Sequence, residues 1–155
     1  MEPSGQIKIQ TKHKTFLYHT NLSWVGKKRG IVHSDGKPGF GVSSPPEFKG
    51  EAGIWTPEDM FVAAIESCLM ATFLAFAERA QIPVTSYRST AEGVLEFVED
   101  GYQFTKVIVR PLIVVRDEEA LERTEKVLQD AKRSCLISNS VRTEIGVEPR
   151  IDWEY

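Results

Sequence analysis

The stretch WTPEDMFVAAIESCLMATFLAFA, residues 55–77, carries the strongest structural signal in the chain. Thr56 can accept hydrogen bonds from the free N–H groups of a first helical turn, and Pro57 has the φ angle that suits the first helical position. Glu58 and Asp59 then place negative charge at the positive end of the helix dipole. These four residues predict a helix that begins directly after Thr56.

The body of this helix, residues 60–77, is apolar except for Glu66, Ser67 and Thr72. A helix that is apolar nearly all round is typical of a protein interior. The stretch is long enough for a membrane, but Glu66 would place a charge inside it and further charged residues flank both ends. We therefore expect a buried helix without membrane contact, and we expect it to stop just past Ala80, shortly before a proline.

The rest of the chain shows strand and helix signals that together favour an α+β fold. A period of two over residues 84–98 is typical of a strand with one wet face, and acidic residues followed by basic ones are typical of a helix over residues 117–134. The region at residues 42–53 is expected to be irregular. The expected strands are 6–12, 16–24, 30–34, 84–98, 104–115 and 147–153, with turns at 27–30, 35–39 and 99–101.

Length and charge narrow the class of protein. A chain of 155 residues fits one domain, here residues 1–155. Its net charge of −3 argues against nucleic acid as a partner. The first residues lack a basic stretch followed by an apolar one, so we expect no export signal and a cytoplasmic protein whose thiols are reduced at rest.

The two cysteines, Cys68 and Cys135, allow three interpretations. Free cysteine is often inert core packing, and this is the default. A metal site is disfavoured, because neither cysteine has a CxxC partner and His13, His19 and His33 are scattered, so no metal or other cofactor is expected. The third interpretation is redox chemistry.

Helical spacing favours proximity of the two cysteines. Leu121, Leu128 and Cys135 are seven positions apart and share one face of the second helix, with Thr124 and Ala131 beside them. That face should pack on the apolar helix that carries Cys68. Cys68 lies too far from the start of its helix for the dipole to lower its pKa, so a cation should be needed. Glu58, about 15 Å away along the axis, could orient that cation, although a simple role at the helix start is the alternative.

Two segments resemble the OsmC-like family. The first contains Pro57-Glu58, an alanine-rich apolar turn and Cys68 ten residues after the glutamate; the second is AKRSCLISNS, residues 131–140. The resemblance covers roughly residues 39–153. It implies an intertwined homodimer with antiparallel sheets packed around two central buried helices, and a site at the subunit interface.

The resemblance also implies a function and roles for three residues. Cys68 would reduce an organic hydroperoxide and become a sulfenic acid, Cys135 would form a disulfide with it, and a dithiol reductant would reset the pair. Glu58 would hold the arginine that this family uses, for which the chain offers Lys49 ahead of Pro57 or Arg29 near the N-terminal hairpin. The alternative is a non-catalytic dimer that binds a hydrophobic small molecule or senses thiol oxidants.

Overall fold

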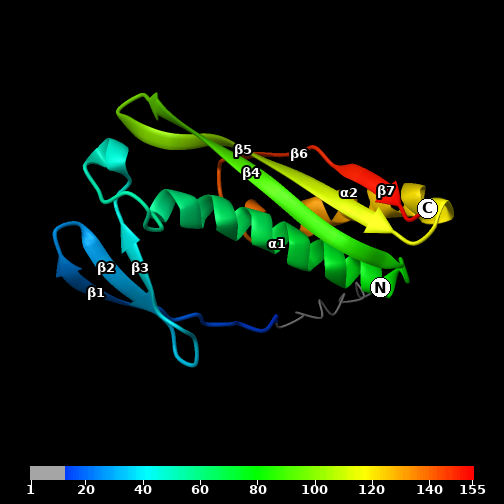
Figure 1. Ribbon diagram of the computed structural model, residues 1–155, viewed down its shortest axis with the longest axis horizontal. Helices are drawn as coiled ribbons and strands as arrows, with labels where there is room; N and C mark the ends of the chain where they lie inside the picture. The colour runs from blue at the N-terminus through cyan, green and yellow to red at the C-terminus, as the bar shows by residue number, and fades with distance from the viewer. Residues whose placement is uncertain (1–12) are drawn as a thin grey trace, which may run out of the picture. The chain divides into compact units, whose positions relative to one another are not determined.

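The computed structural model describes residues 13–155 (Figure 1). The strand expected at residues 6–12 lies outside the described residues. The chain forms two compact units, Met1–Ile54 and Trp55–Tyr155, which are described separately below. The expectation of one domain over residues 1–155 stays a prediction.

The N-terminal unit contains a three-stranded antiparallel sheet in the order β1-β2-β3. Its strands are β1 (Asn21–Gly26), β2 (Arg29–His33) and β3 (Phe40–Ser43), and a 3-10 turn, η1 (Pro46–Phe48), follows them. The strand expected at 16–24 begins five residues later than predicted, while the turn between β1 and β2 lies where it was predicted. The sequence did not indicate β3, because its formation depends on pairing with β2 rather than on its own residues.

The helix α1 (Pro57–Arg79) opens the second unit and confirms the predicted start. The Thr56 side chain accepts from the N–H of Asp59 at 3.0 Å, and the Asp59 carboxylate accepts from the N–H of Thr56 at 3.0 Å. This reciprocal capping box fixes the first turn. Ala80 follows the last helical residue, as expected.

The second sheet is mixed. Strands β4 (Val84–Val98) and β5 (Gly101–Val115) form a long antiparallel hairpin. The single closing strand expected at 147–153 is two strands, β6 (Glu144–Val147) and β7 (Arg150–Trp153), and both run parallel to β5. A helix between β5 and β6 returns the chain to the same end of the sheet, and such a crossover produces parallel pairing. The α+β class is confirmed, and the sheet, which was expected to be antiparallel, is mixed because β6 and β7 pair parallel to β5.

The helix α2 (Leu121–Ser134) makes that crossover, between the 3-10 turns η2 (Glu118–Ala120) and η3 (Ser138–Ser140). Both helices contribute to one core against one face of the β4–β5 hairpin (Figure 1). The helix α1 approaches β4 closely at Gly93, where an added Cβ would lie 2.6 Å from Val62 and 2.7 Å from Phe104. The buried core consists of Ile65, Leu69, Phe73, Ala77, Ile82, Val107, Val109, Ile113, Val115, Ala120, Leu128 and Ala131.

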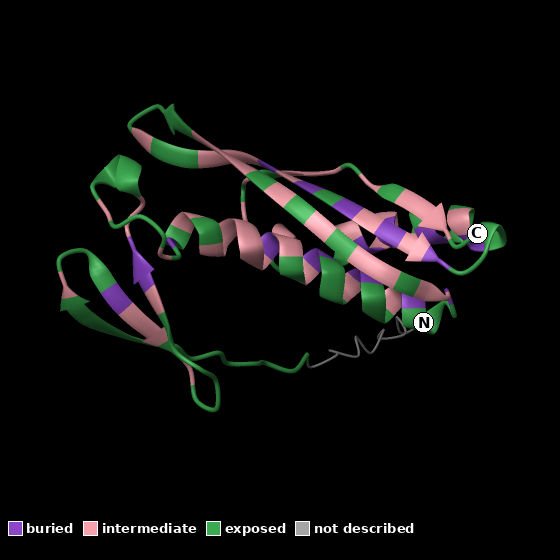
Figure 2. Ribbon diagram, in the orientation of Figure 1, coloured by how far each residue is buried: buried purple, intermediate pink, exposed green. Residues whose placement is uncertain are grey.

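Only one face of α1 is buried in a single chain (Figure 2). Met70 and Leu74 are each 38% exposed on its other side. The expectation of burial all round is therefore wrong for the isolated chain. Among the described residues, α1 is also the one helix long and apolar enough to cross a membrane, a test that the core helix of a soluble protein passes as well.

Candidate thiol site

The second unit brings Cys68 and Cys135 together. Cys68 lies in the middle of α1 and is partly buried, and Cys135 is the residue directly after α2 and is fully buried. Because α1 and α2 pack on each other, the two thiols meet within hydrogen-bonding contact. Both sulfurs thus belong to one site, built from the middle of one helix and the end of another.

The surroundings of Cys68 favour its thiolate. Burial raises the pKa of the thiol, but hydrogen bonds from the main chain of Ile137 and Leu136 and from the side chains of Cys135 and Thr72 together lower it below the ordinary value. These donors come from the turn after α2 and from the next turn of α1. The sequence pointed to a cation for this task and did not indicate the main-chain donors, since any residue type could supply them.

The surroundings of Cys135 have the opposite effect. Burial raises the pKa of its thiol, and the neighbouring Cys68 raises it further. Ser138 opposes this, because its hydroxyl donates a hydrogen bond to the Cys135 sulfur at 3.2 Å. The two thiols therefore differ in acidity, and Cys68 becomes a thiolate first as the pH rises.

Local hydrogen bonds hold the turn that follows α2. The N–H of Asn139 donates to the carbonyl of Cys135 at 3.0 Å, and the Asn139 side chain donates to the carbonyl of Arg133 at 3.1 Å. The Ser140 hydroxyl donates to the carbonyl of Leu136 at 2.8 Å. These bonds satisfy carbonyl groups at the helix end and fix the path of the chain that presents its N–H groups to Cys68.

Glu58 lies in the first turn of α1, away from both thiols along the helix. One of its carboxylate oxygens, Oε2, is buried and has no hydrogen-bond partner among the described residues. A buried polar atom of this kind normally has a partner. The carboxylate is thus placed to receive a donor that the described part of a single chain does not supply.

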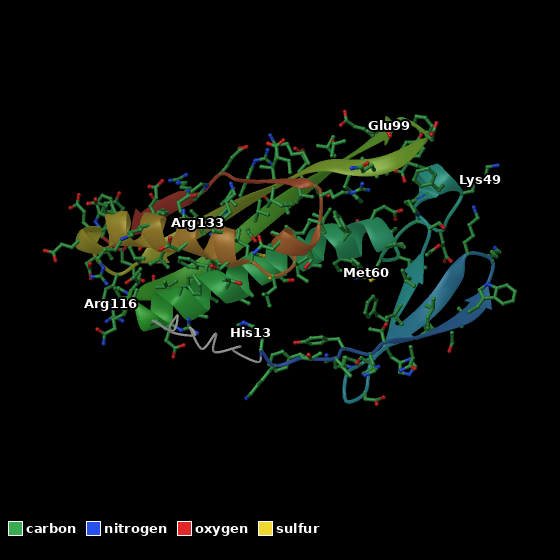
Figure 3. The ribbon with its side chains drawn as sticks, turned by 180° about the vertical axis from the view of Figure 1, so that it is seen from behind. His13, Lys49, Met60, Glu99, Arg116 and Arg133 are labelled. Carbon is green, nitrogen blue, oxygen red and sulfur yellow. The ribbon has the colours of Figure 1, made fainter. Side chains whose placement is uncertain are left out.

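The two candidate cations of the sequence lie in the N-terminal unit. Lys49 ends the η1 turn in the segment that connects β3 with α1 (Figure 3). Arg29, on β2, forms an ion pair with Glu51 at 3.7 Å. Both residues line the same pocket of that unit.

Glu66, the charged residue within α1, has a polar partner on the sheet. Its carboxylate accepts a hydrogen bond from the Ser89 hydroxyl at 2.6 Å. Burial, with a contribution from the charge of Glu66, raises the pKa of the nearby Tyr87 to about 12. Glu66 is therefore accommodated between α1 and β4 by a partner on β4 that sequence reasoning did not predict.

A metal centre has no basis in the described residues. Within 13–155, no three His, Cys, Asp or Glu side chains gather closely enough to hold a metal ion.

Comparison with known proteins identifies the family. The family model described as "OsmC-like protein" matches residues 50–150. The peroxiredoxin OsmC of Escherichia coli is 31% identical over 102 residues, which cover 65% of this chain and 69% of that protein. The organic hydroperoxide resistance protein-like 1 of Staphylococcus epidermidis is 27% identical over 135 residues, or 87% and 95% of the two chains.

A solved structure agrees with these sequence matches. An OsmC-like protein of unknown function from Vibrio cholerae superposes with a TM-score of 0.81 and 28% identity, covering 88% of this chain and all of that one. The family model covers well over half of the present chain, and the fold agrees over most of its length. The chain therefore belongs to the OsmC-like family.

Proposed function

We propose that this protein is a thiol-dependent peroxidase that reduces organic hydroperoxides through a Cys68–Cys135 redox pair. The observation that carries the proposal is the contact between the two thiols together with their opposite pKa shifts. Family membership supports peroxide chemistry in general, and two relatives are described as a peroxiredoxin and an organic hydroperoxide resistance protein. The particular mechanism below is our own proposal.

The reaction has three balanced steps. The Cys68 thiolate attacks the distal peroxide oxygen of ROOH; the O–O bond breaks, a proton is taken up by the leaving alkoxide, and ROH and a Cys68 sulfenic acid result. The Cys135 thiolate then attacks the sulfenic sulfur; the S–S bond forms, the S–O bond breaks, and the leaving hydroxide takes up a proton to give water. A dithiol reductant exchanges with this disulfide, becomes oxidised and restores both protein thiols.

The geometry suits this division of roles. The hydrogen bonds around Cys68 favour the thiolate, which is the nucleophilic form of a thiol. Cys135 is buried and is needed only after oxidation of Cys68, and its raised pKa keeps it in the thiol form, which is a poor nucleophile toward peroxide. No cofactor takes part in the proposed cycle.

The proposed active form is a homodimer. Apolar residues on the uncovered side of α1, including Met70 and Leu74, support association with a second copy. Closed twofold assembly is the commonest kind. The buried Glu58 oxygen without a partner also fits a donor from the second copy, where Glu58 would orient the group that assists Cys68. Sedimentation should detect a dimer at micromolar concentration, and a stable folded monomer would contradict this part of the proposal.

A thiol titration tests the chemistry. The reduced protein is mixed with one equivalent of cumene hydroperoxide, and free thiols are counted before oxidation, after oxidation and after addition of dithiothreitol. We expect rapid loss of both thiols per chain, an intrachain disulfide by intact mass, and full recovery with the dithiol. Cys68→Ser should abolish peroxide consumption, whereas Cys135→Ser should consume one equivalent and retain a sulfenic or over-oxidised Cys68.

Two outcomes would replace the proposal. If wild type and Cys68→Ser consume peroxide equally slowly, the protein is not a peroxidase and a non-catalytic dimer that binds a hydrophobic small molecule becomes the better account. If the disulfide forms but the dithiol does not restore turnover, the pair acts as a sensor of oxidants and not as an enzyme.

A further inference from the structure

The N-terminal unit contains a pocket that the thiol chemistry does not use. Its volume is about 410 Å³, and it lies between the β1–β2 turn and the segment after η1. Four basic residues line it, together with Ser43, Gly50 and one acid, Glu51. The basic residues are Lys27, Lys28, Arg29 and Lys49.

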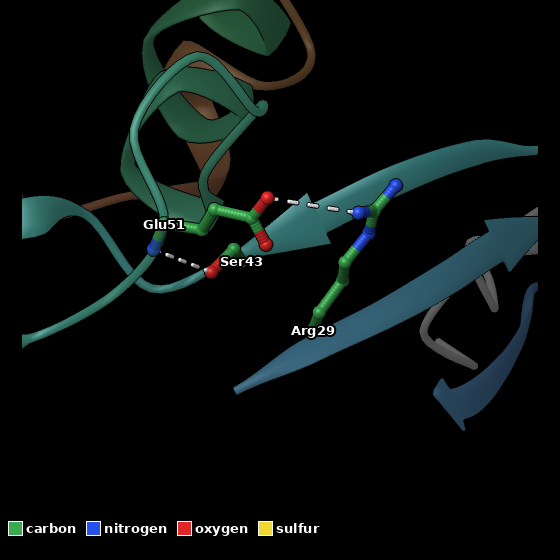
Figure 4. Close-up of polar contacts among 3 residues, drawn as sticks. All are labelled: Arg29, Ser43 and Glu51. Atoms are coloured by element: carbon green, nitrogen blue, oxygen red, sulfur yellow. Dashed lines mark hydrogen bonds and ion pairs between the residues drawn. The ribbon is translucent and has the colours of Figure 1, made fainter. Parts of the chain in front are cut away.

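Polar contacts within the unit hold the walls of this pocket together. The Lys28 ammonium donates to the carbonyl of Phe48 at 2.7 Å, which ties the β1–β2 turn to η1. The hydroxyl of Ser43, a residue only 3% exposed, accepts from the N–H of Glu51 at 3.2 Å (Figure 4). The Arg29–Glu51 ion pair at 3.7 Å joins the same two walls (Figure 4). The pocket is thus formed before any ligand arrives.

The charges in the pocket do not balance. Four cationic side chains face one carboxylate, an excess of three positive charges, in a chain whose net charge is −3. Glu51 pairs with Arg29, so the lysine charges are not neutralised by an acid lining the pocket. Like charges held around a concave surface repel one another and raise the local concentration of anions.

The backbone at two of these lysines is unusual. Lys27 has φ 48° and Lys49 has φ 62°, which is the left-handed region where glycine and asparagine are favoured. Two of the four described non-glycine residues with positive φ are therefore pocket lysines. The other two, Gln81 and Glu99, do not line the pocket, so positive φ reflects the turns that carry these residues and is not itself a sign of a ligand.

From these observations we propose that the pocket is a binding site for a small oxyanion with two or more negative charges, such as a diphosphate, a phosphate ester or a polycarboxylate. Its size suits a small molecule. The ammonium groups supply charge and Arg29 supplies a planar fork of donors for oxygen pairs. The site lies wholly in the N-terminal unit, and its test does not depend on the thiols.

Isothermal titration of the reduced full-length protein with sodium pyrophosphate tests the site, with citrate and acetate as further probes. We expect pyrophosphate to bind at least ~10-fold more tightly than acetate, and the binding to weaken as salt rises from about 0.05 M to about 0.5 M. Comparison of pyrophosphate with citrate separates a preference for phosphate from a preference for charge alone.

Matched variants locate the binding. Lys27→Asn and Lys49→Asn remove the charge while asparagine tolerates the left-handed backbone, so both should fold and each should weaken pyrophosphate binding by about 3- to 10-fold. Glu51→Gln should strengthen it, because the competing carboxylate is lost. Lys126→Ala, on the exposed side of α2, is the control and should leave it unchanged.

Three results would overturn the proposal. The first is no measurable heat with wild type at millimolar pyrophosphate. The second is an equal loss of affinity in Lys126→Ala and Lys49→Asn, which would indicate attraction to net charge alone. The third is unchanged pyrophosphate affinity in both Lys27→Asn and Lys49→Asn, which would place the binding outside this pocket.

Discussion

Removal of the Ser138 hydroxyl should slow disulfide formation at neutral pH and accelerate it at high pH. In the structure this hydroxyl donates to the Cys135 sulfur at 3.2 Å and opposes the rise in the pKa of that thiol caused by burial. Ser138→Ala deletes the donor and leaves the rest of the turn in place. The pKa of Cys135 therefore rises further, and the thiol that attacks the sulfenic acid is less often ionised.

The expected size follows from the hydrogen bond. A hydrogen bond to a charged group contributes about 1.5–3 kcal/mol, and sulfur is a weak acceptor, so the lower end applies. About 1.4 kcal/mol corresponds to a tenfold smaller thiolate population at neutral pH. A more basic thiolate is also a better nucleophile. For a Brønsted coefficient of about 0.4–0.5, each Cys135 thiolate in the variant should attack the sulfenic acid about threefold faster than in wild type. The net effect is about three- to fourfold slower resolution at neutral pH, and about threefold faster resolution above both pKa values.

Single-turnover oxidation measures this effect. Reduced protein is mixed with one equivalent of cumene hydroperoxide and quenched at intervals, and the conversion of Cys68 sulfenic acid to disulfide is followed by mass spectrometry from pH 6 upward. Ser140→Ala is the matched control, because its hydroxyl bonds the Leu136 carbonyl in the same turn and not a sulfur. Ser138→Thr keeps a hydroxyl at this position and should form the disulfide at the wild-type rate at each pH.

The change from slower resolution at neutral pH to faster resolution at high pH in Ser138→Ala, the crossover, separates an effect on acidity from a structural effect. A purely structural loss in Ser138→Ala would slow the reaction at every pH, and Ser140→Ala would share it. If Ser138→Ala shows no crossover, or if the two serine variants behave alike, the hydroxyl does not control the acidity of Cys135 and this reasoning is refuted.

Three further predictions follow from the same structure. Thr72→Val removes a donor to Cys68, so the pKa of that thiol should rise, and its alkylation by iodoacetamide should reach half its maximal rate at a higher pH than in wild type. Glu58→Gln should slow peroxide reduction by about tenfold, the effect of losing one charge-assisted hydrogen bond. The free energy of unfolding, measured by urea titration, should change by no more than about 1 kcal/mol. Phe73→Ala should lower the free energy of unfolding by about 3–5 kcal/mol in urea titrations, because the fully buried ring fills the space between α1 and β4, whereas a loss below about 1 kcal/mol would contradict that packing.

Local signals explain which elements the sequence predicted well. The start of α1 was predicted correctly because Thr56 and Asp59 cap it through bonds that span only three residues. The hairpin of β4 and β5 was predicted because alternation and a turn are also local. The parallel strands β6 and β7 were not, since their direction depends on the crossover through α2. The exposure of one side of α1 in a single chain was also not predicted, because an apolar pattern indicates burial but not which chain provides the contact.

In the thiol site, too, the features with a local sequence signal were predicted and those that depend on the folded turn were not. Heptad spacing on α2 placed Cys135 on the face that meets α1, and the structure brings that thiol to Cys68. The role of Ser138 was not predicted, because a serine three residues after a cysteine is an ordinary turn residue until the turn is folded. The two cations considered from the sequence, Arg29 and Lys49, line one pocket of the N-terminal unit, and the role of either beside Cys68 stays a prediction.

The main-chain donors at Cys68 connect the acidity of this thiol to the shape of one turn. Only proline would remove the N–H group of Leu136 or Ile137, so with any other residue at these positions the effect depends on where the chain runs after α2. That path is held by Asn139, whose N–H donates to the carbonyl of Cys135 and whose side chain donates to the carbonyl of Arg133. The same turn carries Cys135 itself. Formation of a disulfide must move the Cys135 sulfur toward Cys68. If the main chain of this turn moves with that sulfur, we expect the hydrogen bonds from Leu136 and Ile137 to Cys68 to change in the same step.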